Sequence, residues 1–394
     1  MDLNAIRAAL HEQQLDGWLF YDHHHRDPIA YRVLKIAPVM CTRRWYYLVP
    51  VTGEPAKLVH RIERRNLDGL PGTQHEYSSW AEQHERLKAI LASQQRVAMQ
   101  YSALNDIPYL GLVDAGTVEL VKSLGVEVVS SADLVQMFEA RWSQGALTSH
   151  LHAGPVVHAA VRGGFAMIRD AVSSGKAVGE YDVQQEIVRL LNVGDVESDA
   201  PPAVAVNANS SNPHYSPTPA SSQPIRPGDF VLLDVWGKRC SPGSVYFDIT
   251  WTGFVGDRVP GHYTEIFNIV REARDAAVSL VKQAVQEGKT LYGYQVDDAA
   301  RGVISGHGYG EYFVHRTGHS IGEDVHGNGA NMDNFETCDK RKIIARTCFS
   351  VEPGIYLPEF GVRSEVNVYV DEHEARVTGE VQQAVVPILS RSGF

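Results

Sequence analysis

The sequence predicts a two-domain protein, in which an α/β domain precedes a larger α+β domain. Its 394 residues exceed what one hydrophobic core usually organises. Before about residue 145, short apolar runs alternate with helical windows. After that point, long helical windows and strand-like segments no longer alternate strictly, which is typical of helices packed on an antiparallel sheet. We therefore expect domains at residues 1–145 and 146–394.

The N-terminal domain is predicted from the spacing of its apolar residues. Leu3, Ile6 and Leu10 recur at helical spacing, and the apolar run that follows suits a buried strand. Strands are predicted at residues 17–21, 45–51, 96–100 and 126–130, and helices around 80–92 and 114–123. No catalytic constellation stands out in this domain.

Three consecutive histidines, His23 to His25, follow the first predicted strand. With Asp22 and Asp27 they form a possible metal site. However, adjacent residues of an extended segment point in alternate directions, and Pro28 marks the stretch as a loop. We therefore favour a solvated loop over a ligand role.

The second domain is predicted to contain long helices and four strands with apolar cores. The helical windows are 155–173, 181–192 and 264–287. The strand-like segments are 230–236, 245–255, 348–357 and 362–370. A Ser, Pro and Asn-rich stretch at 207–229 is long for a loop inside a domain, which favours a functional role.

Composition excludes several classes of function. The formal net charge of -11 argues against a nucleic-acid-binding surface. No run approaches the ~20 apolar residues of a membrane helix, and the start lacks the layout of a signal peptide, so we expect a cytoplasmic protein without a membrane partner. The scattered cysteines are predicted to be free thiols, buried or partly buried: Cys41, Cys240, Cys338 and Cys348.

Each of the four strand-like segments of the second domain carries an acidic residue inside an apolar run: Asp234, Asp248, Glu352 and Glu365. An ionised carboxylate in a sheet core costs several kcal/mol unless it is paired, hydrogen-bonded or bound to a metal. Any one of these residues alone could be exposed at a strand end. Because only Arg363 is close to them in sequence, the set points to two divalent metal ions.

A glycine-rich segment at 313–329 supplies His315, His319 and His326. Gly318 and Gly322 flank His319, as expected where the backbone turns tightly beside a packed site. One histidine is expected to bind metal and the others to contact substrate. A zinc-protease pair of His315 and His319 on one helix is disfavoured, because no Glu follows His315 and a glycine intervenes.

These motifs resemble the pita-bread metallopeptidases, the family of prolidase, aminopeptidase P, methionine aminopeptidase and creatinase. Five segments occur in the family's order: 228–237, 247–253, 315–326, 351–356 and 362–365. The resemblance implies a C-terminal pita-bread catalytic domain. It also implies a creatinase-like N-terminal domain, non-catalytic, that acts as a lid or in dimerisation. The metal ligands that it implies are Asp234, Asp248, His319, Glu352 and Glu365.

The resemblance also implies a reaction and its participants. A hydroxide bridging two metal ions would attack the carbonyl before proline, with Glu352 as general base and then acid and His326 facing the scissile amide. His214, His315 and Arg363 would contact the substrate. Manganese is the ion expected first, with cobalt or zinc as alternatives. The expected partners are Xaa-Pro peptides and a second copy of the chain in a homodimer.

Among the activities of the family we favour Xaa-Pro dipeptidase over Xaa-Pro aminopeptidase, because Arg363, Arg316 and the histidines could bind a dipeptide carboxylate. A creatinase-type amidinohydrolase or a non-catalytic binding protein is disfavoured by the complete ligand set. Three departures from the family's pattern bear on specificity: a longer hairpin at 237–247, Trp251 in place of Arg, and Arg316 in place of Gly.

Overall fold

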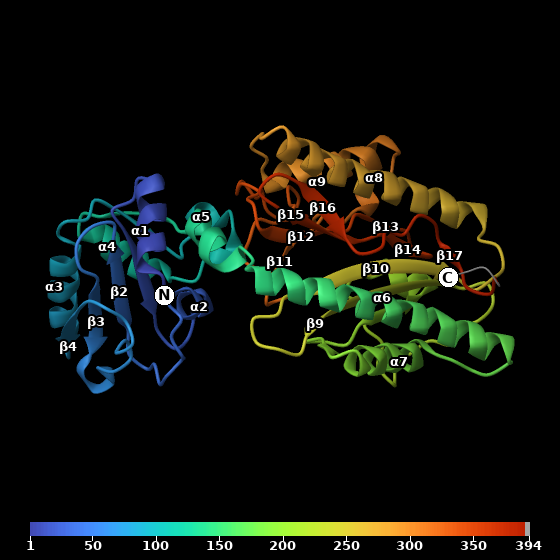
Figure 1. The fold of residues 1–394 in the computed structure, drawn as a ribbon, viewed down its shortest axis with the longest axis horizontal. Coiled ribbons are helices and arrows are strands. Elements are labelled where there is room, and N and C mark those ends of the chain that lie inside the picture. Colours follow the sequence, from blue (N-terminus) through green and yellow to red (C-terminus); the bar gives the residue numbers. More distant parts are fainter. Residues whose placement is uncertain (391–394) are drawn as a thin grey trace. The chain divides into compact units, whose positions relative to one another are not determined.

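The computed structural model describes residues 1–390, so the last four residues of the predicted second domain lie outside the described part. The chain divides into two compact units, Met1–Glu139 and Ala140–Phe394 (Figure 1). This division falls a few residues before the expected boundary at 145. The physical reason is Trp142, whose buried ring packs with residues of the second unit such as Tyr246 and Tyr369.

The first unit is built on a six-stranded mixed sheet with the order β4-β3-β2-β1-β5-β6. Its strands are β1 Gly17–Asp22, β2 Trp45–Pro50, β3 Ala56–His60, β4 Thr73–Tyr77, β5 Arg96–Met99 and β6 Glu127–Ser130. The side chains of β1 alternate between two hydrophobic clusters, with Trp18 in one and Leu19 in the other. Sequence patterning did not identify β3 and β4, because both are short and β4 is a polar edge strand.

The α-helices of the first unit are α1 Leu3–Glu12, α2 Pro28–Leu34, α3 Trp80–Leu91, α4 Ala115–Ser123 and α5 Ala132–Val135. The prediction of a loop through Pro28 is wrong, since this residue begins α2. Proline suits the first turn of a helix, where its missing N–H would be unpaired, and the Asp27 carboxylate accepts a 2.9 Å hydrogen bond from the Ala30 N–H.

The three consecutive histidines lie in a short bend before α2, and His24 and His25 have positive φ angles. The neighbouring Asp22 carboxylate is buried and accepts hydrogen bonds from the Arg26 N–H at 2.7 Å and from the Tyr31 hydroxyl at 2.7 Å. Asp22 therefore organises the bend, in agreement with the loop role favoured for this segment.

Antiparallel pairing dominates the second unit, as predicted. One sheet contains β7 Val196–Glu197, β8 Ala203–Val206, β9 Phe230–Arg239, β10 Phe247–Phe254 and β17 Val386–Pro387. A second contains β11 Ser320–Ile321, β12 Thr347–Val351, β15 Val366–Val370 and β16 Ala375–Thr378. The strands β13 Gly354–Tyr356 and β14 Gly361–Arg363 form a separate hairpin.

Four long helices cover these sheets (Figure 1). The helices α6 Gln144–Ser173 and α7 Glu180–Val193 share a hydrophobic cluster with β9 and β10. The helices α8 Gly261–Gln286 and α9 Gly293–Gly306 share another with β12 and β15. Helix α6 begins earlier than predicted, because Ser143 caps its first turn and Pro155 is accommodated within the helix.

The two C-terminal segments that were predicted as continuous strands are each interrupted. The segment 348–357 breaks between β12 and β13, and 362–370 breaks between β14 and β15. Glu352 and Glu365 lie at these breaks. Extended pairing stops at both acidic residues, which leaves their side chains free to turn toward β10.

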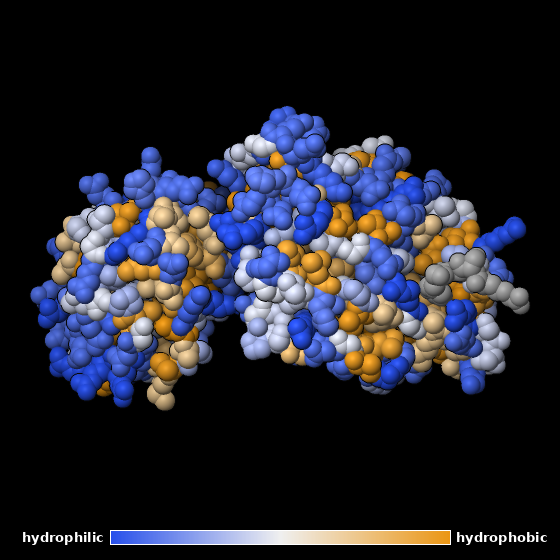
Figure 2. All heavy atoms as spheres, viewed as in Figure 1, coloured by the Kyte–Doolittle hydropathy of each residue, from blue (hydrophilic) through white to orange (hydrophobic). Residues whose placement is uncertain are grey.

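The surface carries both polar and apolar side chains, and Figure 2 shows hydrophilic residues around smaller hydrophobic patches on one face. Across residues 1–390, no helix has the length and apolar character needed to cross a membrane. All four cysteines are free, as predicted. The expectation that all are at least partly buried is wrong for Cys240 and Cys338, which are exposed.

Candidate metal centre

Two of the predicted ligands come from the antiparallel pair β9 and β10. Asp234 is paired with Thr250, and Trp236 is paired with Asp248. Directly paired residues, and residues two apart along a strand, project from the same face of a sheet. The register therefore brings Asp234 and Asp248 to one face of the sheet.

The two glutamates reach this face from the breaks in the other strands, and a neighbouring hydroxyl orients each of them. The Thr250 Oγ1 donates a 2.8 Å hydrogen bond to Glu365 Oε2, and the Ser350 Oγ donates one of 2.9 Å to Glu352 Oε1. Both hydroxyl groups are fully buried. Each glutamate thus retains a second oxygen with which to bind another group.

His319 completes the cluster. Its Nε2 lies 3.5 Å from Asp248 Oδ2 and 3.4 Å from Glu352 Oε1. Its Nδ1 lies 3.1 Å from the Ser320 carbonyl oxygen, which accepts a hydrogen from that nitrogen and leaves Nε2 as a free electron-pair donor toward the carboxylates.

The glycines on the two sides of His319 differ in what they require. A Cβ added to Gly318 would lie 1.9 Å from the Ser350 carbonyl oxygen, so only glycine allows the backbones to approach here. A Cβ added to Gly322 would meet no atom closer than 3.9 Å. The expectation of a tight approach is therefore correct at Gly318 and wrong at Gly322.

The cluster has the properties of a metal site. Asp248, His319 and Glu365 each offer a ligand atom, and these atoms lie within 4.8 Å of one another. The buried oxygens Asp248 Oδ1 and Glu365 Oε1 have no hydrogen-bond partner. An unpartnered buried oxygen is costly, and a divalent cation would satisfy both. Asp234 and Glu352 adjoin the same group through Arg363 and His319, and their carboxylates could supply further oxygen ligands.

The electrostatics of the cluster lead to the same conclusion. Burial raises the pKa of Asp248 and Glu365 well above the usual range, and nearby carboxylates raise both further. Burial also raises the pKa of Asp234 to about 7, against the opposing effect of Arg363. By contrast, His319 and Arg363 outweigh burial at Glu352, whose pKa is lowered. Negative charge is concentrated here beyond what one guanidinium neutralises.

Arg363 is the cation within the cluster. Its guanidinium forms an ion pair with Asp234 and donates hydrogen bonds to Thr250 Oγ1 at 2.9 Å and to the Tyr356 hydroxyl at 3.2 Å. It is buried, with a side-chain exposure of 4%. Arg363 was predicted to contact the substrate. In the structure its side chain is buried and contacts the candidate ligand Asp234.

The other predicted substrate residues lie at different distances from the cluster. The His326 and His319 rings lie 4.4 Å apart and nearly perpendicular. His315 is in a loop, as expected, and its Nε2 lies 2.7 Å from the Tyr356 hydroxyl, which joins it to the Arg363 network. His214 is exposed in the loop after β8, and within residues 1–390 no hydrogen bond joins it to the ligands.

Several residues that support the site escaped the sequence analysis. Asn367 exchanges two hydrogen bonds with the Asp248 backbone, at 2.8 and 3.1 Å. Tyr356 links His315 to Arg363, and Thr250 and Ser350 orient the glutamates. The residues Thr250, Ser350 and Asn367 each lie two positions from a ligand. Alternation along β10 places Thr250 on the face of Asp248, so this period was the signal that would have found Thr250, whereas Glu352 and Glu365 lie outside the strands of Ser350 and Asn367.

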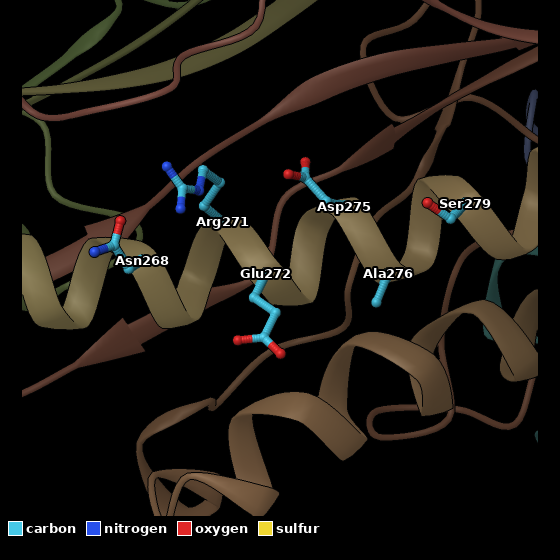
Figure 3. A pocket seen from close by; sticks show the side chains of 6 residues that line it. All are labelled: Asn268, Arg271, Glu272, Asp275, Ala276 and Ser279. Carbon is cyan, nitrogen blue, oxygen red and sulfur yellow. The ribbon is translucent and has the colours of Figure 1, made fainter.

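A pocket on the outer side of α8 lies apart from these residues (Figure 3). Its lining comes from one helix: Asn268, Arg271, Glu272, Asp275, Ala276 and Ser279. None of the candidate ligands lines this pocket, and its two carboxylates, Glu272 and Asp275, are exposed on one helix. We therefore assign the chemistry to the carboxylate cluster.

Comparison with known proteins agrees with this assignment. A model of metallopeptidase family M24 matches residues 149–372, which include all five candidate ligands. An Xaa-Pro dipeptidase of Lactobacillus helveticus is 31% identical over 214 residues, which cover 54% of this chain and 52% of that protein. The chain therefore spans about half the length of curated relatives of this kind.

Solved structures extend the likeness over both units. The dipeptidase PepE of Mycobacterium ulcerans is 24% identical, with a TM-score of 0.70 over 97% of this chain and 96% of that one. An X-prolyl aminopeptidase of Caenorhabditis elegans, described as a cytosolic enzyme with a di-nuclear active site, is 15% identical with a TM-score of 0.65, and the match covers 99% of this chain and 63% of that one. The predicted fold, a creatinase-like domain followed by a pita-bread domain, is confirmed.

Proposed function

Because the chain belongs to metallopeptidase family M24, we propose that it hydrolyses the peptide bond before proline, as an Xaa-Pro dipeptidase that uses two divalent metal ions. The observation that carries this proposal is the set of two buried and two partly buried carboxylates around His319, in which two oxygens lack partners. Such a set is costly to maintain without cations.

Each candidate ligand has a role in the proposed site. Asp234, Asp248, His319, Glu352 and Glu365 would hold the two ions. Ions bound there would polarise the scissile carbonyl and generate hydroxide from water near neutral pH. Manganese is the ion that we propose first, because oxygen-rich sites with one imidazole suit harder divalent ions.

Proton transfer is assigned to Glu352. Its lowered pKa keeps it ionised at neutral pH, and Ser350 holds its Oε1, so that Oε2 can accept a proton. Glu352 would take the proton from the attacking water as the new C–O bond forms. It would return that proton to the proline nitrogen as the C–N bond breaks. His326, whose pKa the neighbouring His319 and burial lower to about 4, would act as a neutral hydrogen-bond donor to the developing oxyanion.

The preference for a dipeptide rests on Arg316. Its charge lowers the pKa of both His319 and His326, which supports a position beside the site. A half-buried guanidinium there suits the free carboxylate of a dipeptide. Arg363 is less suited to this task because its side chain is buried, with an exposure of 4%. An enzyme that accepts longer peptides must leave open the part of the site where the chain continues after proline.

The test compares activity on Xaa-Pro dipeptides and Xaa-Pro-Xaa tripeptides, after the protein has been loaded separately with manganese, cobalt or zinc. Cleavage of dipeptides is the expected result. Cleavage of tripeptides alone would favour the aminopeptidase alternative, and absence of both activities would refute the proposal.

A variant ties the activity to the ligands. Asp248→Asn should lose bound metal and reduce kcat/KM by more than about hundredfold, since even residues that only support a metal ligand contribute about 10–100-fold. Asp257→Asn, in an exposed loop after β10, is the matched control and should behave as the wild type. Full metal content and activity in Asp248→Asn would show that the site is misassigned.

A further inference from the structure

An aromatic residue of β9 projects beside the metal ligands on the same sheet face. Trp236 is paired with Asp248 and lies two residues after Asp234, so its side chain projects on the side of both ligands. The indole is partly exposed. It therefore borders the site on the side of β9 rather than filling the core.

The Trp236 indole fixes an exposed carboxylate. Its Nε1 donates a 2.8 Å hydrogen bond to Asp199 Oδ1, in the segment between β7 and β8. Because Trp236 is the residue paired with Asp248, the carboxylate that its indole holds lies near the face of β9 that carries the candidate ligands. The carboxylate is thus open to solvent and close to groups that would surround the substrate.

The surroundings of this carboxylate within residues 1–390 determine what it can bind. Among residues 1–390, no lysine or arginine forms an ion pair with Asp199. The nearby Lys238 is engaged elsewhere, because its Nζ donates a 2.7 Å hydrogen bond to the Glu323 carbonyl oxygen and lies 4.9 Å from the centre of the Tyr246 ring. The Tyr246 hydroxyl also hydrogen-bonds to Asp199, so both of its side-chain partners are neutral and the carboxylate can bind a cation brought by a ligand.

We propose that Asp199, held by Trp236, binds the α-ammonium group of the substrate's first residue. This inference rests on the proposed function. In an Xaa-Pro dipeptide, one carbon separates the ammonium nitrogen from the scissile carbonyl, so that the ammonium must lie beside the metal ligands. A fixed carboxylate next to an aromatic ring suits a primary ammonium through charge and cation–π attraction.

The test compares two ligands that differ only in the amine: alanyl-proline and propanoyl-proline. In the metal-loaded enzyme, Asp199→Asn should raise KM for alanyl-proline about fivefold and leave kcat nearly unchanged, as expected for loss of an exposed charge pair. The inhibition constant of propanoyl-proline against alanyl-proline should stay at the wild-type value. Asp195→Asn, at another exposed aspartate before β7, is the matched control and should change neither constant.

A second variant tests the positioning role of Trp236. Trp236→Phe keeps an aromatic ring and removes the N–H that holds Asp199, so KM for alanyl-proline should rise while kcat is retained. Equal weakening of both ligands by Asp199→Asn would overturn the proposal, as would an effect confined to substrates with a cationic first side chain, such as lysyl-proline.

Failure of the proposed function would be distinguishable from failure of this inference. If the wild-type protein cleaves no Xaa-Pro peptide, the proposed function fails. The same comparison is then made by calorimetry on the metal-loaded protein. A preference for alanyl-proline that Asp199→Asn removes would support the ammonium site, and an unchanged preference would overturn it.

Discussion

The Thr250 hydroxyl hydrogen-bonds to both an acidic and a basic side chain of the site. It donates to Glu365 Oε2 at 2.8 Å and accepts from Arg363 Nε at 2.9 Å, and it is fully buried. A valine has the same shape but can make neither bond. Thr250→Val should therefore leave one acceptor and one donor unsatisfied, both of them charged.

We expect Thr250→Val to weaken metal binding by about 10–100-fold, because residues that orient a ligand typically contribute that much. Metal titration by calorimetry measures the effect. Thr252→Val is the matched control, since Thr252 is also buried on β10 but its hydroxyl makes only a 3.5 Å contact with Gln382. If the two variants bound metal equally well, the orienting role of Thr250 would be disproved.

At the residue scale, the candidate ligands stand out in the sequence, whereas the hydroxyl groups that orient them do not. Asp234 and Glu352 stand out because a charge inside an apolar run conflicts with burial. Thr250 and Ser350 cause no such conflict, since a hydroxyl is unremarkable in a strand. Their partners depend on which segments become neighbours, and the contact between β10 and the segment from β14 to β15 is a long-range property. The burial of Arg363 against Asp234 depends on the same contact.

At the scale of elements, helix α6 holds β10 through two buried histidines. The Tyr246 carbonyl oxygen accepts a 2.6 Å hydrogen bond from His150 Nδ1. His158 Nε2 accepts a 3.0 Å hydrogen bond from the Glu380 N–H, so this nitrogen carries no proton. Both rings pack against Phe247. Each imidazole is therefore neutral in the folded state.

Acid should destabilise this contact. Burial lowers the pKa of His158 to about 4 from an ordinary value of 6.5; the nearby Glu380 opposes this shift and Arg162 adds to it. Between these pH values the unfolded chain binds the proton and the folded one does not. The stability that the neutral ring contributes is therefore present above pH 6.5 and is lost as pH falls toward 4.

His158→Gln removes the titrating group and keeps a side-chain acceptor. From pH 7 to pH 5, we expect this variant to lose about 2 kcal/mol less unfolding free energy than the wild type, as follows from the two pKa values. Urea unfolding at several pH values measures the difference. His152→Gln, at an exposed position of the same helix, should keep the wild-type slope. An identical slope in His158→Gln would contradict a neutral buried ring.

Elements were predictable where their own residues determine them. The apolar stripe of α8 and the apolar runs of β1 and β9 are periodic signals, and all three elements formed close to the predicted residues. Helix α9 was missed because it is bounded by glycines and carries polar residues such as Asp297, whose buried carboxylate is satisfied by Arg301 and Thr317. The Arg301 pair is an i,i+4 contact within the helix, but the bonds from Thr317 are tertiary, and hydrophobic periodicity reveals neither.

At the scale of the whole molecule, the candidate ligands all belong to the second unit. The first unit, Met1–Glu139, has its own sheet and its own hydrophobic clusters. Tryptophans are divided between the units, with Trp18, Trp45 and Trp80 in the first. Because all the candidate ligands lie in the second unit, metal bound to them would directly stabilise the folded state of that unit.

Metal removal should lower the stability of the second unit selectively. The unfolded chain lacks the assembled site, so free metal at one hundred times its dissociation constant stabilises the folded site by about 2.7 kcal/mol. Without cations, the ligand carboxylates also repel one another. We expect a chelator to lower the melting temperature of one calorimetric transition, and hydrogen exchange to increase in residues 140–390 while remaining unchanged in 1–139. A chelator that altered exchange equally in both units, or in neither, would contradict a metal site confined to the second unit.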